Sequence, residues 1–403
     1  MELLSILAGL HTGVAAVLAL LAFWLLLEVV RAQPAVSRTD DKEPGPIAVV
    51  IPAHNEGTGV AATVADVLAQ LRSHDRLIVV ADNCSDNTAD VARDAGAEVI
   101  ERTDAERRGK GFALQFALDH LRTDPPSSVV FTDADCFHTD GLIKAVARQA
   151  EVNGKPVQPL YIMRAGPDAP AKRAVAAFAW LLINDVRMRG LWSLAKTTRL
   201  TGAGAAFPWA IAEGLALGSG EIVEDLALTI TLARAGTPVL LNTDHTVFSD
   251  FPETENAITV QRARWEHGSL RMIGTQSMSL AMSAFGSGGW PALALALNVA
   301  IPPISVFAAI LIANALVASL FAVFGWMTPL LLALFAGAAA ASALVLAWSR
   351  YGQETLPPSK LSALAAFAAS KFGVYGQKAR ASSTQWTRTP REHEGDHTPK
   401  GSA

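Results

Sequence analysis

Residues 128–135 read Ser128-Val-Val-Phe-Thr132 followed by Asp133-Ala-Asp135. The first part is rich in β-branched and aromatic side chains and predicts a short buried strand. The second part places two carboxylates, one residue apart, where that strand ends. Two such carboxylates can hold one hard divalent cation through oxygen ligands. This segment is therefore both a marker of the fold and a candidate metal site.

Strands and helices alternate on the N-terminal side of this segment. Residues 47–51, 77–81 and 98–100 are short apolar runs that predict strands, and helical spacing is found over residues 59–72, 88–95 and 111–121. This alternation predicts an α/β fold with a parallel, doubly wound sheet. In such a sheet, ligands bind at the carboxyl ends of the strands.

Acidic residues follow three of the predicted strands. Glu56 comes after the first strand, Asp82 after the second, and Asp133 and Asp135 after the fourth. Carboxylates that converge on one sheet edge repel one another, and a metal ion or a sugar–phosphate ligand would relieve that repulsion. The convergence therefore predicts a ligand site at this edge.

Two of these acids have simpler structural interpretations. A carboxylate at Asp82 can accept a hydrogen bond from a nucleobase or a ribose hydroxyl, but Ser85, Asp86 and Thr88 show that this segment also carries helix-capping residues. We favour Asp82 for the ligand and Asp86 for the cap. Glu56 is a second candidate for the nucleoside, or simply begins the helix that follows.

Arg108-Gly-Lys110-Gly places two cations between glycines at a predicted helix start. Glycine lets the backbone approach closely, and the N-terminus of a helix favours anions. The pattern suits a diphosphate at Arg108 and Lys110. A solvated basic turn is the alternative.

Two further motifs lie in the second half of the chain. Glu224 and Asp225 open a predicted helix, where one carboxylate would act as general base on an acceptor hydroxyl, or both would simply favour the helix dipole. Gln261, Arg264 and Trp265 belong to a Gln-Arg-Ala-Arg-Trp motif that offers a phosphate-binding arginine and an aromatic platform for a sugar. A snorkelling arginine and an interfacial tryptophan explain the same residues.

Long uncharged stretches at both ends predict membrane segments. Residues 3–27 carry no charge and are long enough to cross a bilayer, and the acidic start and long apolar run favour an uncleaved anchor over a signal peptide. Residues 272–349 contain no Asp, Glu, Lys or Arg, and predict one span over about 292–324, bent at Pro302-Pro303, and a second over about 328–349. Residues 272–289 and 361–375 each suit an interfacial helix, with a re-entrant piece as a further possibility for the second and a helix packed under the α/β domain as the alternative for both.

The predicted organisation has five parts. They are an N-terminal transmembrane anchor (1–31), an α/β domain (45–270), an interfacial helix (271–290), two transmembrane helices (291–350), and an amphipathic or re-entrant segment with a basic tail (351–403). Positive residues flank the spans on one side, which predicts an integral protein of the plasma (inner) membrane with a cytoplasmic middle domain.

The net charge and the cysteine content argue against a nucleic-acid-binding protein, a disulfide-rich protein and a zinc protein. The formal net charge of −4 gives no support for a nucleic-acid partner. The two cysteines, Cys84 and Cys136, form neither a disulfide framework nor a zinc pattern, which agrees with a reducing compartment.

Asp82, Asp133-Ala-Asp135, Gly202-Ala-Gly204, Glu224-Asp225 and the 261–265 motif stand in an order that resembles the family 2 inverting glycosyltransferases with a GT-A fold. Residues 45–270 carry the resemblance. Within the family, the chain is most similar to the membrane branch of cellulose, hyaluronan and poly-N-acetylglucosamine synthases and ceramide glucosyltransferase. His54 departs from that branch, where many members have tyrosine.

The resemblance implies a role for each motif. Glu56 and Asp82 would contact a uridine-type nucleoside, and Asp133 and Asp135 would hold Mg²⁺ or Mn²⁺ together with the diphosphate. Asp225 would be the catalytic base. Gln261, Arg264 and Trp265 would form the acceptor and diphosphate end of the site. The implied reaction is a single displacement with inversion at the anomeric carbon.

Four functional hypotheses remain. The first is transfer of one or a few sugars from a nucleotide-sugar donor to a lipid or glycan acceptor at the cytoplasmic face. The second is a polysaccharide synthase that needs export or synthase partners, or oligomerisation, because three spans are few for a channel. The third, a non-catalytic scaffold or sensor, predicts lost acids, and the fourth, a transporter, predicts intramembrane charges. Neither feature is present in the sequence.

Overall fold

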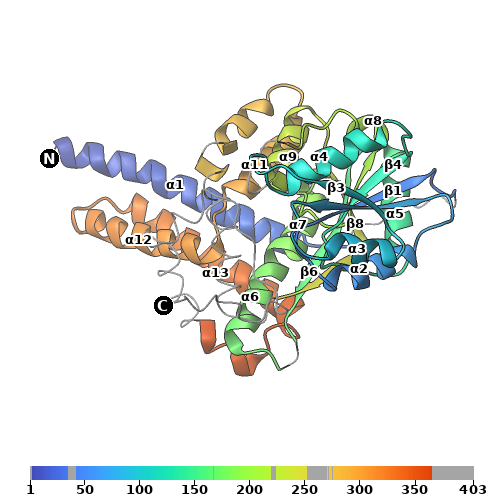
Figure 1. Cartoon of the computed structure of the whole chain (residues 1–403). Helices are drawn as coiled ribbons and strands as arrows, with labels where there is room; N and C mark the ends of the chain where they lie inside the picture. Colours follow the sequence, from blue (N-terminus) through green and yellow to red (C-terminus); the bar gives the residue numbers. More distant parts are fainter. Residues whose placement is uncertain are drawn as a thin grey trace, which may run out of the picture.

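The computed structural model describes residues 2–34, 42–166, 168–218, 224–251, 270, 272–274 and 276–364. These residues form an α/β domain from which three apolar helices project on one side, with the N-terminus at the far tip (Figure 1). The Gln-Arg-Ala-Arg-Trp motif at 261–265 and most of the predicted segment 361–375 lie outside the described residues.

An eight-stranded sheet forms the centre of the described α/β domain, in the order β3-β2-β1-β4-β7-β6-β8-β5. The strands β3, β2, β1 and β4 are mutually parallel, as the sequence predicts. The other half is mixed, because β7 pairs antiparallel with both β4 and β6. The strands are β1 (Ile47–Ala53), β2 (Arg76–Asp82), β3 (Glu98–Arg102), β4 (Ser128–Phe131), β5 (Phe137–His138), β6 (Val157–Arg164), β7 (Ala205–Pro208) and β8 (Leu240–Asp250).

Helices cover both faces of this sheet. Alternate residues of β1 face opposite sides: Val49 packs with α2 (Gly59–Leu68), α3 (Thr88–Asp94) and α5 (Leu142–Asn153), whereas Val50 packs with α4 (Lys110–Leu121), α8 (Trp209–Ala212) and α9 (Glu224–Arg234). A strand buried on both faces has no polar face, which explains its continuous apolar sequence. The predicted α/β fold, with helices on both faces of a sheet whose N-terminal half is parallel, is therefore confirmed.

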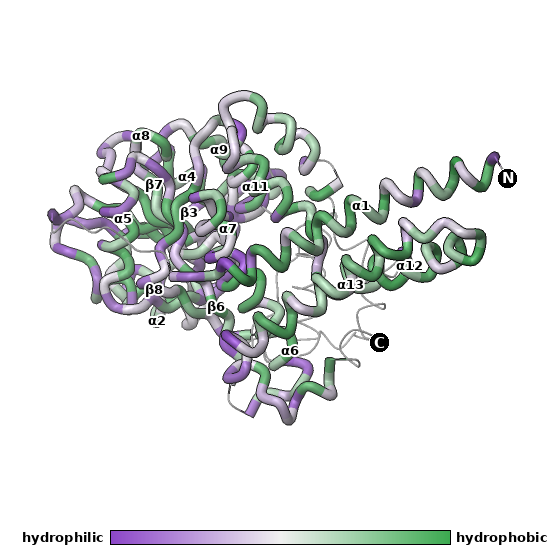
Figure 2. The backbone as a smooth tube through the Cα atoms, turned by 180° about the vertical axis from the view of Figure 1, so that it is seen from behind, coloured by the Kyte–Doolittle hydropathy of each residue, from purple (hydrophilic) through white to green (hydrophobic). Residues whose placement is uncertain are grey.

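Three of the described helices are long and apolar enough to cross a membrane: α1 (Glu2–Val30), α12 (Ile304–Val323) and α13 (Thr328–Ala347), which continues as a π-helical turn (Trp348–Gly352). They lie side by side and are coloured almost entirely hydrophobic, in contrast to the mixed α/β domain (Figure 2). Apolar side chains on their outer faces, such as Ile312 and Leu316 on α12, are largely exposed. Exposed apolar side chains on a long helix are typical of a surface that faces lipid.

The predicted bent span at 292–324 is two helices. Residues 301–303, which include both prolines, separate α11 (Gly289–Ala300) from α12. Proline lacks the N–H that an unbroken helix requires, so the first segment stops after 12 residues. That length is too short to cross a bilayer. Instead, α11 packs against α7 (Arg187–Ala195), α1 and α9.

The predicted interfacial helix at 272–289 has two different sides. Met272 and Leu280 are buried in the cluster that also contains residues of α1 and α11, whereas Met278 and Met282 are exposed. The buried side packs as a helix under the α/β domain would. The exposed methionines suit the interfacial interpretation.

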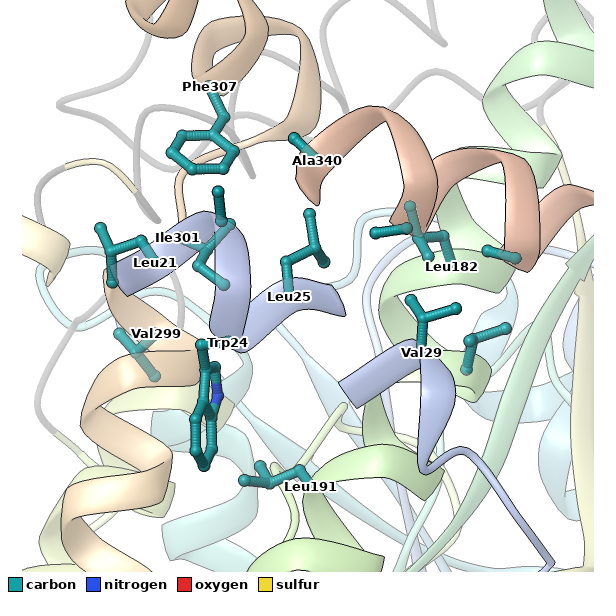
Figure 3. Packing of buried hydrophobic residues seen from close by; sticks show 14 of the residues in the cluster. Leu21, Trp24, Leu25, Val29, Leu182, Leu191, Val299, Ile301, Phe307 and Ala340 are labelled. Carbon is teal, nitrogen blue, oxygen red and sulfur yellow. The ribbon is translucent and has the colours of Figure 1, made fainter. Parts of the chain in front are cut away.

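The C-terminal end of α1 is embedded in the α/β domain. Leu21, Trp24, Leu25 and Val29 contact a cluster built from α7, α11, α12, α13 and the π-helical turn Leu182–Val186, which follows α6 (Ala171–Leu181) (Figure 3). At the C-terminal end of α13, a 3-10 turn (Pro358–Lys360) returns to α6. The apolar helices and the α/β domain therefore share one hydrophobic core.

Candidate active site

The two carboxylates after β4 lie at the carboxyl edge of the sheet, as predicted. β4 stands between β1 and β7, so the turn Asp133–Asp135 is at the centre of that edge. The ammonium of Lys110, the first residue of α4, lies 2.6 Å from Asp133 Oδ1. The preceding Gly109 has φ 126°, a conformation that residues with a Cβ rarely adopt, and it starts α4 where Lys110 can reach the carboxylate.

A glycine loop brings the second pair of acids to the same place. Lys110 Nζ donates a hydrogen bond of 3.0 Å to Gly202 O. Gly202 has φ +87°, and a Cβ there would clash with Asp225 Oδ2 and lie 2.7 Å from Lys110 Nζ. Only glycine permits this approach. Lys110, Asp133 and Asp225 are therefore gathered around one loop, although they come from three distant segments of the sequence.

The helix that carries Glu224 and Asp225 is fastened to this loop. Leu200 N donates a hydrogen bond of 2.9 Å to Thr229 Oγ1, which itself donates to Asp225 O at 2.7 Å. A cavity of about 20 Å³ lies behind the two acids, large enough for about one water molecule. Its lining is mostly apolar: Gly111, Leu114, Phe131, Leu200, Gly202, Ala205, Phe207, Leu217 and Leu228, with Glu224 and Asp225.

Burial and mutual repulsion raise the pKa values of two acids in this cluster. Burial raises the pKa of Glu224 to about 7, and the neighbouring Asp225 adds to the shift, while Lys110 opposes it. Burial also raises the pKa of Asp133; Lys110 lowers it and Asp135 raises it further. One ammonium thus stands among four carboxyl groups, and the site has an excess of negative charge.

The donor set fits a divalent metal that is completed by its substrate. Asp133 and Asp135 supply carboxylate oxygens, the ligands that Mg²⁺ and Mn²⁺ accept, and Asp225 adds a further carboxylate to the cluster. Within the described parts of the chain, no three His, Cys, Asp or Glu side chains are grouped to hold a metal on their own. Such a site needs further oxygen ligands, which a diphosphate can provide.

Asp82 lies at the end of β2, which β1 separates from β4, and it has a partner that the sequence motifs do not reveal. Its Oδ1 accepts a hydrogen bond of 2.6 Å from Arg102, which also lies 5.6 Å from the centre of the Phe112 ring. Arg102 is directly opposite Asp82 in the register of β2 and β3. His54 Nδ1 lies 2.7 Å from the backbone oxygen of Asp82 and ties this end of the site to the loop after β1.

The remaining predicted residues lie in turns or outside the described part of the chain. Glu56 is half-buried in the turn between β1 and α2, and Arg108 is exposed just before α4. Asp86 accepts a hydrogen bond of 3.1 Å from Thr88 N at the start of α3, in keeping with its expected capping role. Gln261, Arg264 and Trp265 lie outside the described residues, so the acceptor end of the site stays a prediction.

Comparisons with known families agree with this fold. A profile of glycosyl transferase family 2 matches residues 48–205. A profile of glycosyl transferase family group 2 matches residues 129–345, more than half of the 403 residues. The matched regions include Asp82, the Asp133–Asp135 turn and Glu224-Asp225.

Two known proteins are similar to this chain. The low-salt glycan biosynthesis hexosyltransferase Agl6 of Haloferax volcanii is 35% identical over 94 residues, which is 23% of this chain and 21% of Agl6, so the match spans about a fifth of that relative. The mannosyltransferase PcManGT of Pyrobaculum calidifontis, solved with GDP-Man and Mn²⁺, is 18% identical, with 84% of this chain and 99% of that chain covered at a TM-score of 0.50. At that identity the second likeness concerns the fold.

Proposed function

The chain belongs to glycosyl transferase family group 2, and from that membership we propose that it transfers a sugar, with inversion, from a nucleotide-sugar donor to a hydroxyl of a lipid or lipid-linked acceptor. The observation that carries the proposal is the meeting of Lys110, Asp133 and Asp225 around Gly202 at the carboxyl edge of the sheet. A diphosphate-binding cation, a metal-binding acid and a candidate base are the groups that such a reaction requires.

The donor would lie along the strand ends. Asp82, fixed by Arg102, and Glu56 would bind the nucleoside, while Lys110 and the exposed Arg108 would contact the diphosphate. Asp133 and Asp135 would hold Mg²⁺ or Mn²⁺, and a cation bound there would neutralise the charge of the departing nucleoside diphosphate. We expect a UDP-sugar, with a GDP-sugar as the competing donor because PcManGT was solved with GDP-Man.

Asp225 would remove the proton from the acceptor hydroxyl as its oxygen attacks the anomeric carbon. We assign this role to Asp225 rather than Glu224 because Asp225 lies against Gly202, within the group of side chains that includes Lys110 and Asp133. Glu224, whose pKa is raised to about 7, would be largely protonated below that pH and would limit the negative charge beside the base.

The acceptor class follows from the apolar helices. We infer that α1, α12 and α13 cross the plasma (inner) membrane with the catalytic domain on the cytoplasmic side, because the basic residues Arg31 and Arg350 lie at the ends of helices that enter the domain. The core that these helices share with the domain would hold the site at the membrane surface. An acceptor carried by a lipid would be presented there. A processive polysaccharide synthase with partner subunits is the alternative.

The test is donor turnover by the full chain in lipid nanodiscs with Mn²⁺ or Mg²⁺. Radiolabelled UDP-, GDP- and dTDP-sugars are offered with membrane lipid extract, and Asp225→Asn and Asp135→Asn are compared with the exposed control Asp119→Asn on α4. We expect label in a short, lipid-extractable product with wild type and the control, and none with the two site variants. Long polymer would support the synthase alternative, and failure to use any donor would overturn the proposal.

A further inference from the structure

One face of α2 carries two polar side chains: Thr63 contacts the turn bearing Asp133 and Asp135, and Asp66 contacts His138, three residues after that turn. The helix is otherwise apolar where it meets the sheet, with Val60, Val64 and Val67 fully buried. Thr63 and Asp66 interrupt this face at a spacing of three residues, which places them one above the other on the helix surface. Polar residues in such a setting require partners, and both have them.

The first contact is to the middle of the turn. Thr63 Oγ1 donates a hydrogen bond of 2.8 Å to Ala134 O, the backbone oxygen between the two candidate metal ligands. Thr63 is 1% exposed, so water does not compete for this bond. The bond fixes the peptide that joins Ala134 to Asp135.

The second contact passes through a histidine. Asp66 Oδ2 lies 2.6 Å from His138 Nδ1 and accepts a further bond of 3.1 Å from His138 N. His138 Nε2 in turn lies 2.8 Å from Thr132 Oγ1. In the tautomer that donates its Nδ1 proton to the Asp66 carboxylate, Nε2 is an acceptor for the Thr132 hydroxyl. Asp66, His138 and Thr132 thus form one chain from α2 to the end of β4.

This arrangement has the residue types of a hydrolase triad but not its exposure. Thr132 is 0% exposed, and the His138 side chain is equally buried. A nucleophile has to reach its substrate, so the hydroxyl here cannot act as one. This hydrogen-bonded series of Asp66, His138 and Thr132 can therefore serve only to position neighbouring residues.

The two contacts enclose Asp133. Thr132, the residue before it, is held by His138 and by its own N–H, which donates to Val50 O at 3.1 Å. Ala134, the residue after it, is held by Thr63. The backbone is thereby held on both sides of the candidate ligand, by His138 and β1 before it and by α2 after it, while its carboxylate stays directed toward Lys110.

We propose that Thr63, Asp66 and His138 are positioning residues that hold Asp133 and Asp135 in the geometry needed to bind the divalent metal. The inference rests on the proposed metal-dependent transfer. Side chains that orient metal ligands without touching the metal typically change its affinity by about 10–100-fold when they are replaced. Octahedral ions such as Mg²⁺ demand a close fit, so a turn that is free to move would bind them weakly.

Two pairs of variants test this role in the full chain in nanodiscs, and each pair compares a conservative substitution with a disruptive one. His138→Gln keeps an acceptor and a donor on one side chain, whereas His138→Leu has neither; Thr63→Ser keeps the hydroxyl, whereas Thr63→Val keeps only the shape. Mn²⁺ affinity is measured by electron paramagnetic resonance, nucleoside diphosphate affinity in EDTA by calorimetry, and folding by thermal melting. Asp135→Asn serves as the control for specific binding at the turn.

We expect His138→Leu and Thr63→Val to weaken Mn²⁺ binding by at least about tenfold, and the Gln and Ser variants to stay within about threefold of wild type. Nucleotide affinity in EDTA should be unchanged, because the strand ends that bind the nucleoside are not held by these residues. If His138→Leu does not fold, Asp66→Ala gives the same comparison, because it removes the acceptor for His138 and, with that side chain 22% exposed, opens a gap to solvent and no sealed cavity.

Wild-type Mn²⁺ affinity in folded His138→Leu and Thr63→Val, or in Asp66→Ala, would overturn the inference and leave the proposed function intact. Equal Mn²⁺ binding by wild type and Asp135→Asn would have a different meaning. It would remove the metal site from the proposed function, and the positioning role would fall with it.

Discussion

Lys110 and Asp133 form an ion pair of 2.6 Å between the start of α4 and the end of β4. The ammonium therefore occupies a place beside the carboxylate that a divalent cation would also approach. Two unit charges about 4 Å apart interact by roughly 4 kcal/mol at an effective dielectric constant near 20, so the two cations compete strongly. Donor binding would relieve this competition if the diphosphate draws the ammonium away.

This competition predicts opposite effects of one substitution on two ligands. In Lys110→Gln, Mn²⁺ should bind about tenfold more tightly in the absence of donor, because a positive charge beside Asp133 is removed. Donor affinity should fall by about tenfold, because a charge-assisted contact to the diphosphate is lost. Calorimetric titration of each ligand alone measures both, with Lys144→Gln as the control, whose partner is the exposed Glu43. Weaker Mn²⁺ binding in Lys110→Gln would contradict the competition.

Gly202→Ala should nearly abolish transfer. A Cβ at this position would clash with Asp225 Oδ2, and φ +87° is strained for alanine. Displacing a reacting group by about 1 Å is enough to lower the rate by about 100-fold. Steady-state kinetics should therefore show at least that loss in kcat. Gly166→Ala, where nothing lies within 4 Å of the added Cβ, should be as active as wild type; comparable rates for the two variants would exclude the steric argument.

The fold was largely predictable because its signals are local. Strand–helix alternation and the acids at strand ends defined the parallel half of the sheet, and uncharged runs defined three helices that the structure confirms as long and apolar enough to span a membrane. The mixed half was not predicted, since antiparallel pairing of β7 with β4 and β6 depends on contacts between distant segments. The effect of Pro302-Pro303 was underestimated, because a bend and a complete break look alike in sequence.

The candidate site was predictable in its members but not in its contacts. Spacing identified Lys110 as a cation at a helix start, yet its contact with Asp133 and Gly202 depends on how α4 sits beside β4. Arg102 was missed although a signal existed: it lies one strand away from Asp82 and in register with it. Asp66 gave no signal, because a polar residue in an apolar helix is ordinarily a surface position, and His138 gave none, because it lies in a two-residue strand with no pattern of its own.

Glu224 should make stability depend on pH. Its pKa is raised from the ordinary value of 4.5 to about 7 by burial and by Asp225, so between these two pH values the folded chain retains a proton that the unfolded chain releases. The stabilising contribution of this group is then complete below about pH 4.5 and is lost as pH rises to about 7. Glu224→Gln cannot lose a proton, so the variant should gain stability relative to wild type over this range.

The measurement is the melting temperature in nanodiscs with EDTA at pH 5 and pH 8. The difference between Glu224→Gln and wild type should increase by about 2 °C or more toward pH 8, because about 1 kcal/mol shifts the melting temperature of a domain of this size by that amount. Saturating Mn²⁺ should reduce the increase, since a bound cation favours the ionised acid. A difference that is independent of pH would show that Glu224 titrates normally.

Glu28 and Arg187 should control the attachment of α1 to the catalytic domain. Arg187 Nε donates to Glu28 Oε2 at 2.7 Å, and Glu28 Oε1 accepts bonds from Trp24 Nε1 at 2.8 Å and Asn298 Nδ2 at 2.6 Å. Glu28 is 0% exposed, and its partners at positions 187 and 298 lie 159 and 270 residues away. No local pattern in the sequence reveals this network. In the sequence, Glu28 is only the residue at which an apolar run ends.

Removing one member leaves the other charge buried and unpaired. Glu28→Met and Arg187→Met should each destabilise the protein by about 3–5 kcal/mol, whereas the double variant should be more stable than either, because an apolar pair carries no uncompensated charge. Thermal melting in nanodiscs measures the stability of the two single variants and of the double variant. The control is Glu101→Gln, which breaks the exposed Arg93–Glu101 ion pair. Since α7 leads into the loop that carries Gly202, both single variants should also lose kcat. Additive effects in the double variant would mean that the two residues stabilise the junction independently.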